Sequence, residues 1–133
     1  MTEQSSSKAN VLLLDDDKFL VDMYSMKFQQ SGFNVHACLS TADALKTLRD
    51  GFSADVIVFD LVMPEGDGFA FLESIKNEKL AEHAVKIALT NQMNDADMQR
   101  VMALGGTRYI VKATMIPSEV VNSVVEEIAK KRN

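Results

Sequence analysis

The feature that most constrains the fold is an alternation of short apolar runs with longer segments of helical periodicity. Five runs rich in β-branched and aliphatic residues, typical of buried strands, span residues 10–14, 34–37, 55–59, 85–89 and 108–111. Between them, apolar residues recur at spacings of three and four, which predicts helices. Nearly continuous apolar strands that alternate with helices indicate a parallel sheet covered on both faces. We therefore expect an α/β, doubly wound domain built from five βα units.

The first predicted helix offers an apolar stripe that could cover the sheet. Phe19, Met23 and Met26 follow one another at helical spacing, and Phe28 comes shortly after them. We expect this stripe to be the buried face of that helix.

The size and charge of the chain limit its function. Its 133 residues, 47% of them hydrophobic, suit one domain at residues 9–133, preceded by a polar, serine-rich segment that we expect to be a flexible tail at residues 1–8. We expect no attached effector domain at this length. The net charge of −5 argues against direct binding to nucleic acid.

The single cysteine and the short apolar runs indicate the cellular compartment in which the protein is expected. Cys38 has no partner for an intramolecular disulfide, which favours a reducing environment. The first residues contain no apolar signal-peptide core, and the apolar runs are too short to cross a bilayer. We expect a cytoplasmic protein with no membrane contact.

Chemically capable side chains follow four of the five predicted strands. Three aspartates, residues 15–17, follow the first strand, and Asp60 follows the third. Thr90 follows the fourth strand and Lys112 the fifth. The second strand is followed by Cys38, which suggests no such chemistry. Right-handed crossovers bring the carboxyl ends of parallel strands to one edge, where doubly wound folds carry their sites. Clustered carboxylates repel one another unless a positive charge joins them. The pattern therefore predicts a cation site at this edge.

The residue types at this edge suit phosphoryl transfer. A few carboxylate oxygens are the ligands that Mg²⁺ prefers, and Mg²⁺ also accepts phosphate ligands. Asp60 is the candidate nucleophile, because a carboxylate can form an acyl phosphate when positive charge neutralises the phosphoryl oxygens. Lys112 would supply a cation and Thr90 a hydroxyl donor to those oxygens.

Four motifs carry a resemblance to a known family. They are VLLLDDD (residues 11–17), VIVFDLVMPEGDG (56–68), IALT (87–90) and LGGTRYIVK (104–112). In this order and at these strand ends, they resemble the receiver domain of bacterial two-component response regulators, from about residue 10 to the last helix. The resemblance implies a flavodoxin-like (βα)5 fold with a five-stranded parallel sheet in the order 2-1-3-4-5.

The resemblance also implies roles for the acidic residues. Asp60 would accept a phosphoryl group from the phosphohistidine of a sensor histidine kinase or of a histidine phosphotransfer protein. Asp16 would bind Mg²⁺ directly, together with Asp60, and Asp15 would act through water. The backbone carbonyl of Val62 would complete the metal ligands from the protein.

Thr90 and Tyr109 would form a switch. Lys112 and Thr90 would bind the phosphoryl oxygens, and Tyr109 would turn inward as the Thr90 hydroxyl moves toward the phosphoryl group. This change would alter the surface of the fourth helix, fifth strand and fifth helix, which a downstream protein would recognise. Met93, Met98, Met102 and Met115 fall on or beside the fourth and fifth helices, where adaptable thioethers suit a partner surface. The resemblance leaves open a monomer or a phosphorylation-dependent dimer.

The chain departs from the family pattern in the loop after the fifth strand. Ala113 stands where the family has a cis-proline after the lysine, and a cis bond before a non-proline residue costs about 2.5–4 kcal/mol. Val62 and Gln92 occupy the two positions that set the lifetime of the phosphoryl group. We expect Gln92 to orient an attacking water, and Val62 to contribute no hydrogen bond.

Other functions are compatible with parts of the pattern. A receiver that binds partners without phosphorylation is one alternative, although the complete set of strand-end residues argues against it. A Mg²⁺-dependent phosphohydrolase would normally carry a second acid where this chain has Val62. A carrier of FMN or a dinucleotide would need a phosphate-binding loop at residues 15–17, whose carboxylates repel phosphate. We therefore expect a phosphoacceptor signalling domain and not a turnover enzyme.

Overall fold

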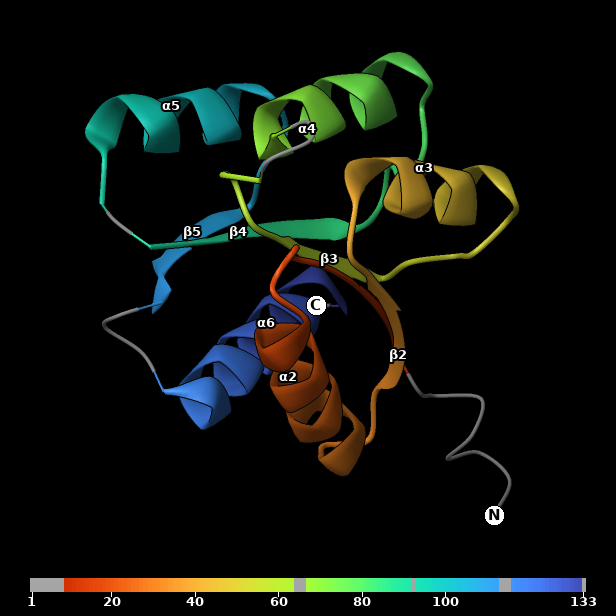
Figure 1. Ribbon diagram of the computed structural model, residues 1–133, viewed down its shortest axis with the longest axis vertical. Helices are drawn as coiled ribbons and strands as arrows, with labels where there is room; N and C mark the ends of the chain where they lie inside the picture. Colours follow the sequence, from red (N-terminus) through yellow and green to blue (C-terminus); the bar gives the residue numbers. More distant parts are fainter. Residues whose placement is uncertain (1–8, 64–66, 92, 113–115, 133) are drawn as a thin grey trace.

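The computed structural model describes residues 9–63, 67–91, 93–112 and 116–132 and contains a five-stranded parallel sheet (Figure 1). The sheet order is β2-β1-β3-β4-β5, as the resemblance implied. The strands are β1 (Asn10–Leu14), β2 (Asn34–Cys38), β3 (Val56–Phe59), β4 (Val85–Thr90) and β5 (Arg108–Val111). The helices are α2 (Lys18–Gln30), α3 (Thr41–Arg49), α4 (Gly68–Asn77), α5 (Asp95–Ala103) and α6 (Pro117–Arg132).

The helices cover the sheet on both faces. Figure 1 shows α2 and α6 on one side and α3, α4 and α5 on the other. Each strand is followed by a helix, so the structure confirms the doubly wound α/β prediction. In the described part of the chain, no helix has the length and apolar character needed to span a membrane.

The core consists of two layers, one on each face of the sheet. Successive side chains of a strand point to opposite faces. Val58 belongs to the layer under α2 and α6, whereas its neighbours Ile57 and Phe59 belong to the layer under α3, α4 and α5. All four residues of β3 are buried, which is why this central strand lacks polar alternation.

Three strand boundaries differ by one residue from the prediction. β2 continues to Cys38, which pairs with Leu14 of β1, and β4 continues to Thr90, which pairs with Val111 of β5. β3 begins at Val56, directly after Asp55, whose backbone nitrogen donates to the carbonyl of Asn10 and whose carboxylate accepts from the backbone nitrogen of Asn10. Thr90 is therefore the last residue of a strand and not the first residue after it.

The predicted buried face of α2 is confirmed for Phe28 and for Met23, which packs against the core, but it was wrong for the other two residues. The side chains of Phe19 and Met26 are 76% and 58% exposed, whereas Val21, Tyr24 and Phe28 are buried against the sheet. Positions 21, 24 and 28 also follow the three–four spacing of a helix, so the segment carries two apolar stripes. The structure buries the stripe that contains Val21, Tyr24 and Phe28 in the core under α2 and α6.

Aspartates begin the helices that follow the two acidic strand ends. The Asp17 carboxylate accepts hydrogen bonds from the backbone nitrogens of Phe19 and Leu20, at 3.0 and 3.2 Å, and caps α2. Asp67 caps α4 in the same way, at 2.8 Å from the backbone nitrogen of Ala70. Such caps satisfy backbone donors that have no partner within the helix. Asp17 and Asp67 therefore act as helix N-caps.

Substitutions of two phenylalanines test which side chains are buried in the core and which face of α2 is exposed. Phe71 of α4 is fully buried, whereas Phe19 of α2 is largely exposed. We expect Phe71→Ala to lower the free energy of unfolding by about 3–5 kcal/mol, because it leaves a cavity in the core. Phe19→Ala should change the free energy of unfolding by less than about 0.5 kcal/mol. Urea denaturation followed by circular dichroism measures both, and equal losses in the two variants would contradict the assignment of the α2 face.

Candidate functional site

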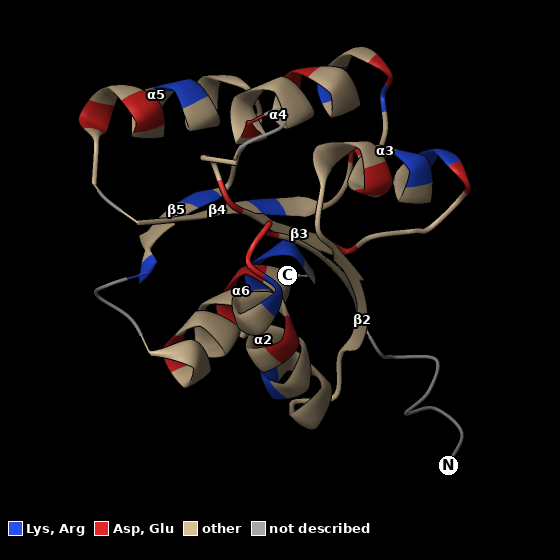
Figure 2. Ribbon diagram, in the orientation of Figure 1, with Lys and Arg blue, Asp and Glu red and all other residues tan. Residues whose placement is uncertain are grey.

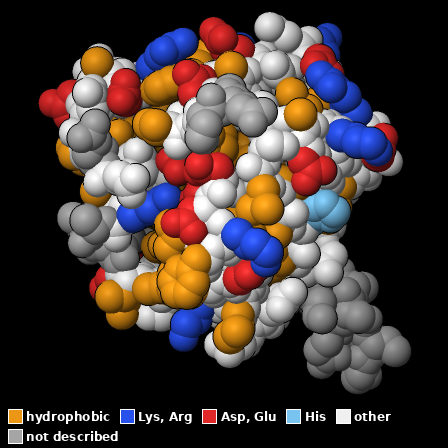
Figure 3. Space-filling view, in the orientation of Figure 1, with side chains coloured by type: hydrophobic (Ala, Val, Ile, Leu, Met, Phe, Trp, Pro, Cys, Tyr) orange, Lys and Arg blue, Asp and Glu red, His pale blue; other side chains and the backbone are white. Residues whose placement is uncertain are grey.

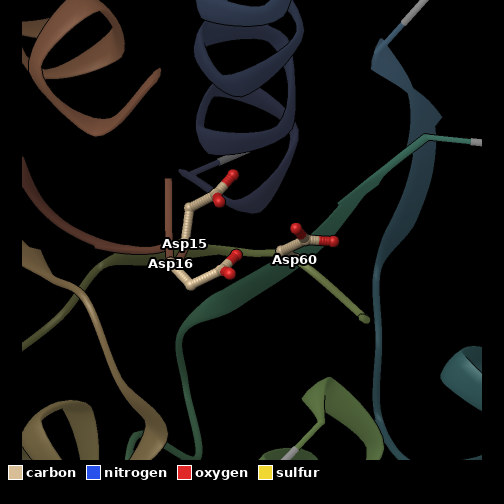
Figure 4. Close-up of side chains that lie close together, drawn as sticks. All are labelled: Asp15, Asp16 and Asp60. Carbon is tan, nitrogen blue, oxygen red and sulfur yellow. The ribbon is translucent and has the colours of Figure 1, made fainter. Parts of the chain in front are cut away.

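Three aspartates meet at the carboxyl edge of the sheet. Asp15 and Asp16 follow β1, and Asp60 follows β3. Because β1 and β3 are neighbours with Leu14 opposite Phe59, the residues after them lie side by side. One carboxylate oxygen of each aspartate lies within 4.8 Å of the others. Figure 4 shows the three side chains close together at this edge. We call Asp15, Asp16 and Asp60 the acidic cluster.

Backbone hydrogen bonds hold the acidic cluster in place. The backbone nitrogen of Asp60 donates to the carbonyl of Leu14 at 2.9 Å, and that of Asp15 donates to the carbonyl of Cys38 at 3.2 Å. These bonds continue the strand ladders past the ends of β1 and β3. Asp15 and Asp60 are consequently buried, while Asp16 is exposed, so the acidic cluster opens to solvent on one side.

Lys112 reaches the acidic cluster from the end of β5. Its Nζ donates to an oxygen of Asp15 at 2.8 Å and to an oxygen of Asp60 at 3.4 Å. Only 11% of the lysine side chain is exposed. Burial of the ammonium acts to lower the pKa of Lys112, but the hydrogen bond to Asp15 and the charges of Asp15 and Asp60 outweigh it and raise this pKa. Lys112 therefore stays protonated between the two carboxylates.

The pKa of Asp60 is raised above its ordinary value. Burial is the main cause, and the negative charge of Asp15 adds to it. The Lys112 ammonium and the backbone N–H of Val62, which donates to Asp60 at 3.2 Å, act in the opposite direction but do not cancel the effect of burial. Ionised Asp60 is thus short of compensating positive charge.

The geometry suits a hard divalent cation. Three carboxylates face one ammonium, so a net negative charge remains in a partly buried space that is open on one side. Mg²⁺ binds one or two carboxylates and keeps several waters, for which the exposed side leaves room. The acidic cluster therefore fits a metal ion.

The acidic cluster is visible on the surface. Figure 2 shows red segments at the carboxyl ends of β1 and β3 and a blue segment at the end of β5. In Figure 3, acidic side chains gather near the middle of this face, with hydrophobic side chains over α2 and the start of α6. Phe19 of α2 and Ile116, directly before α6, are 76% and 62% exposed. Charged and apolar groups thus lie side by side around the opening.

The other predicted residues take different places at the same edge. Thr90 is buried at the end of β4, beside β3, and Tyr109 of β5 is half-buried against the core under α3, α4 and α5. The side chain of Val62 is 71% exposed. Gln92, Met115 and the peptide bond between Lys112 and Ala113 involve positions outside the described residues.

Two residues contribute to this edge in ways that the sequence did not reveal. The Tyr24 phenol is buried beneath it, and burial raises its pKa while the nearby Lys112 charge opposes the shift. Gly68 lies against the strand end, where a Cβ atom would be 2.5 Å from the Asp60 carbonyl oxygen and 2.9 Å from Leu61 Cα. No sequence signal indicated this close approach.

A family model described as the response regulator receiver domain matches residues 11–124. The chain belongs to this receiver domain family. The acidic cluster of this receiver is consistent with a phosphoacceptor site, and receivers are typically signalling domains rather than enzymes.

Two curated relatives contain a similar domain within longer proteins. A probable cyclic di-GMP phosphodiesterase of Vibrio cholerae is 30% identical over 117 residues, which make up 88% of this chain and 26% of that protein. Response regulator SaeR of Staphylococcus aureus is 30% identical over 112 residues, or 84% of this chain and 47% of SaeR. The receiver thus spans about a quarter to a half of the length of these relatives.

Solved receiver structures share the fold along almost their whole length. A CheY-like receiver domain protein from Methanospirillum hungatei has a TM-score of 0.85 at 20% identity, with 95% of this chain and 98% of that chain covered. Chemotaxis response regulator CheY4 of Vibrio cholerae has a TM-score of 0.81 at 25% identity, with 92% and 99% covered. The fold is therefore that of CheY-like receivers.

The raised pKa of Asp60 predicts a pH-dependent stability. Because this pKa lies above the ordinary value of 3.8, ionising Asp60 opposes folding, and stability falls as pH rises from 3.8 through the folded-state pKa. Without divalent cations, we expect Asp60→Asn to be more stable than the parent at neutral pH and the difference to vanish below pH 3.8. The control Asp22→Asn removes a carboxylate whose side chain is 64% exposed. Thermal unfolding against pH measures the effect, and a difference that does not depend on pH would contradict it.

The close approach of Gly68 predicts that a single methyl group disturbs this edge. In Gly68→Ala, the added Cβ would collide with the backbone of Asp60 and Leu61, so the end of β3 must shift. We expect the free energy of unfolding to fall by about 1–3 kcal/mol. The control Glu73→Ala, at an exposed position of the same helix, should change it by less than about 0.5 kcal/mol. Equal stability of Gly68→Ala and the parent in urea denaturation would contradict the prediction.

Proposed function

We propose that this receiver accepts a phosphoryl group on Asp60 from the phosphohistidine of a sensor histidine kinase or of a histidine phosphotransfer protein. The observation that carries the proposal is the contact of Lys112 with both Asp15 and Asp60 at the acidic cluster. A buried carboxylate with a cation beside it and an open side is what a phosphoryl acceptor requires.

The proposed reaction moves a phosphoryl group from nitrogen to oxygen. A carboxylate oxygen of Asp60 forms a bond to phosphorus as the bond from phosphorus to the donor histidine nitrogen breaks, and the bonding electrons stay on that nitrogen. The product is an aspartyl phosphate. The protein accelerates this transfer mainly by positioning the reacting groups and by stabilising the charge on the phosphoryl oxygens.

The residues around Asp60 would stabilise the charge that this transfer moves. Asp15, Asp16, Asp60 and the backbone carbonyl of Val62 would hold Mg²⁺, which neutralises phosphoryl oxygens when bound. Lys112 contacts Asp60 at 3.4 Å and can donate to the oxygens of a phosphoryl group there. The Thr90 hydroxyl, at the end of the neighbouring strand, would donate to the same group.

The proposed output passes through Thr90 and Tyr109. Movement of the Thr90 hydroxyl toward the phosphoryl group would let Tyr109 turn inward from its half-buried position on β5. The surface that changes consists of α5, β5 and α6. Met93 and Met102 are 59% and 43% exposed, before and on α5, which supports an adaptable surface for a downstream protein or a second receiver.

The lifetime of the aspartyl phosphate would depend on Val62 and Gln92. The exposed Val62 side chain offers no hydrogen bond to water near Asp60. We infer that Gln92 orients the water that attacks phosphorus. Residues 9–133 form the proposed receiver, and residues 1–8 the proposed tail before it.

Phosphorylation by a small donor tests the proposal. Incubation with Mg²⁺ and acetyl phosphate should add one phosphoryl group by intact-mass spectrometry, and Asp60→Asn should abolish it. Lys112→Ala should slow the addition about a hundredfold, as expected for loss of one charge-stabilising donor. Asp50→Asn, which removes an exposed carboxylate on the surface, is the matched control and should react like the parent.

Three results would contradict the proposal. An adduct that persists in Asp60→Asn would place the acceptor elsewhere. No adduct with the parent would favour a receiver that binds partners without phosphorylation. Repeated turnover of unrelated phosphate esters would favour a phosphohydrolase.

A further inference from the structure

A pocket of about 320 Å³ lies between the ends of α4 and α5. Ile75, Leu80, Met102 and Leu104 supply most of its apolar wall, and Lys86 of β4 also lines it. Lys86 is the second residue of β4, so the pocket lies toward the edge of the sheet opposite to the acidic cluster. We call it the α4–α5 pocket. Since a water molecule occupies about 30 Å³ in the liquid, it has room for about ten non-hydrogen atoms.

Lys86 is a buried cation that has no carboxylate partner. Its residue is 8% exposed, and its Nζ donates to the carbonyl oxygens of Ala81 and Ala84 at 2.9 and 3.1 Å. Within the described ranges, no acidic side chain forms an ion pair with it. Buried charges in proteins are normally paired, and an ammonium has three hydrogens to donate. Two hydrogens meet carbonyls, so one remains for a ligand.

The loop beside this lysine is held in an unusual conformation. Lys79 and Ala81 have positive φ angles of 58° and 50°, which residues with a Cβ rarely adopt. Lys86 donates to the carbonyl of Ala81, so it also fixes the loop that carries Leu80 into the pocket wall. Non-glycine residues in such conformations cluster at functional sites. The two hydrogen bonds of Lys86 are explained by its role in holding the loop. That role does not explain why a pocket lies beside this lysine.

We propose that the α4–α5 pocket binds a small monocarboxylate with an apolar chain. The carboxylate would accept a hydrogen bond from Lys86, and the chain would lie against Ile75, Leu80 and Met102. Such an occupant supplies the charge that Lys86 lacks and covers the apolar wall, as ligands do in pockets with few polar groups.

The charges around the pocket select this class of ligand. Lys76 also lines the pocket, so a cationic ligand would meet two ammonium groups. An uncharged ligand could accept a hydrogen bond from Lys86 but would leave its buried charge unbalanced. Exposed Glu82 on the wall would repel a second negative charge, which favours a monoanion over a dianion. Burial lowers the pKa of Lys86, with the charge of Lys131 adding to this shift and that of Glu82 opposing it, so a bound carboxylate would raise it again.

Binding to this pocket does not depend on the proposed phosphorylation. Lys86 and Thr90 lie toward opposite ends of β4, and Thr90 is at the edge of the acidic cluster. The test therefore uses unphosphorylated protein without Mg²⁺, and its result is separate from that of the phosphorylation experiment.

Titration of the ¹⁵N-labelled protein with octanoate tests the proposal. Amide signals of Leu80, Lys86 and Gly105 should shift with a single saturating isotherm, while octylammonium and acetate at equal concentrations should shift them little. Lys86→Met should weaken octanoate binding about tenfold, through loss of one charge-assisted hydrogen bond. Met102→Trp, at a partly exposed position of the wall, should abolish binding by filling the space.

Several outcomes would overturn the proposal. Equal shifts with octylammonium, shifts confined to another region, or unchanged affinity in Lys86→Met would each do so. If Lys86→Met fails to fold, Met102→Trp decides the matter, because octanoate binding that survives in this variant excludes the α4–α5 pocket.

Discussion

The contact of Lys112 with Asp15 and Asp60 is the interaction on which the candidate site depends. Two buried carboxylates at the ends of adjacent parallel strands repel one another, and burial already raises the pKa of Asp60. The lysine arrives from β5, the edge strand that is separated from β3 by β4, so the sheet order itself decides that these groups meet. The same contact leaves the acidic cluster with more negative than positive charge. That residual charge is why the cluster suits a divalent cation and a phosphoryl group.

The site could be predicted from the sequence because its residues follow strands. Asp60 comes immediately after an apolar run, and Thr90 and Lys112 end or follow two others, so the topology of a parallel sheet brings them to one edge without any knowledge of side-chain packing. The observed strand bounds differ from the predicted ones by only one residue, and differences of this size leave the same residues at the carboxyl edge. The α2 face was different, since both apolar stripes of that helix satisfy the same spacing. Phe28 belongs to both stripes, and only the packing of Val21 and Tyr24 in the core distinguishes them.

Residues whose roles depend on a close three-dimensional contact left no clear sequence signal. Gly68 is required by its approach to the Asp60 carbonyl, yet in the sequence it resembles any glycine at the start of a helix. Lys86 interrupts an otherwise apolar strand, and periodicity alone cannot show whether such a lysine reaches solvent. The structure shows that it turns instead to two loop carbonyls beside a pocket.

The two buried lysines of this receiver show how one sheet supports opposite electrostatic environments at its two edges. At the carboxyl edge, Lys112 lies between two carboxylates, and its pKa is raised despite burial. Toward the amino edge, Lys86 has only carbonyl partners, and burial lowers its pKa. The carboxyl edge holds surplus negative charge that a cation would balance, whereas the α4–α5 pocket holds a positive charge that an anion would balance. Because α4 begins beside Asp60 and ends beside Lys86, this one helix borders both sites.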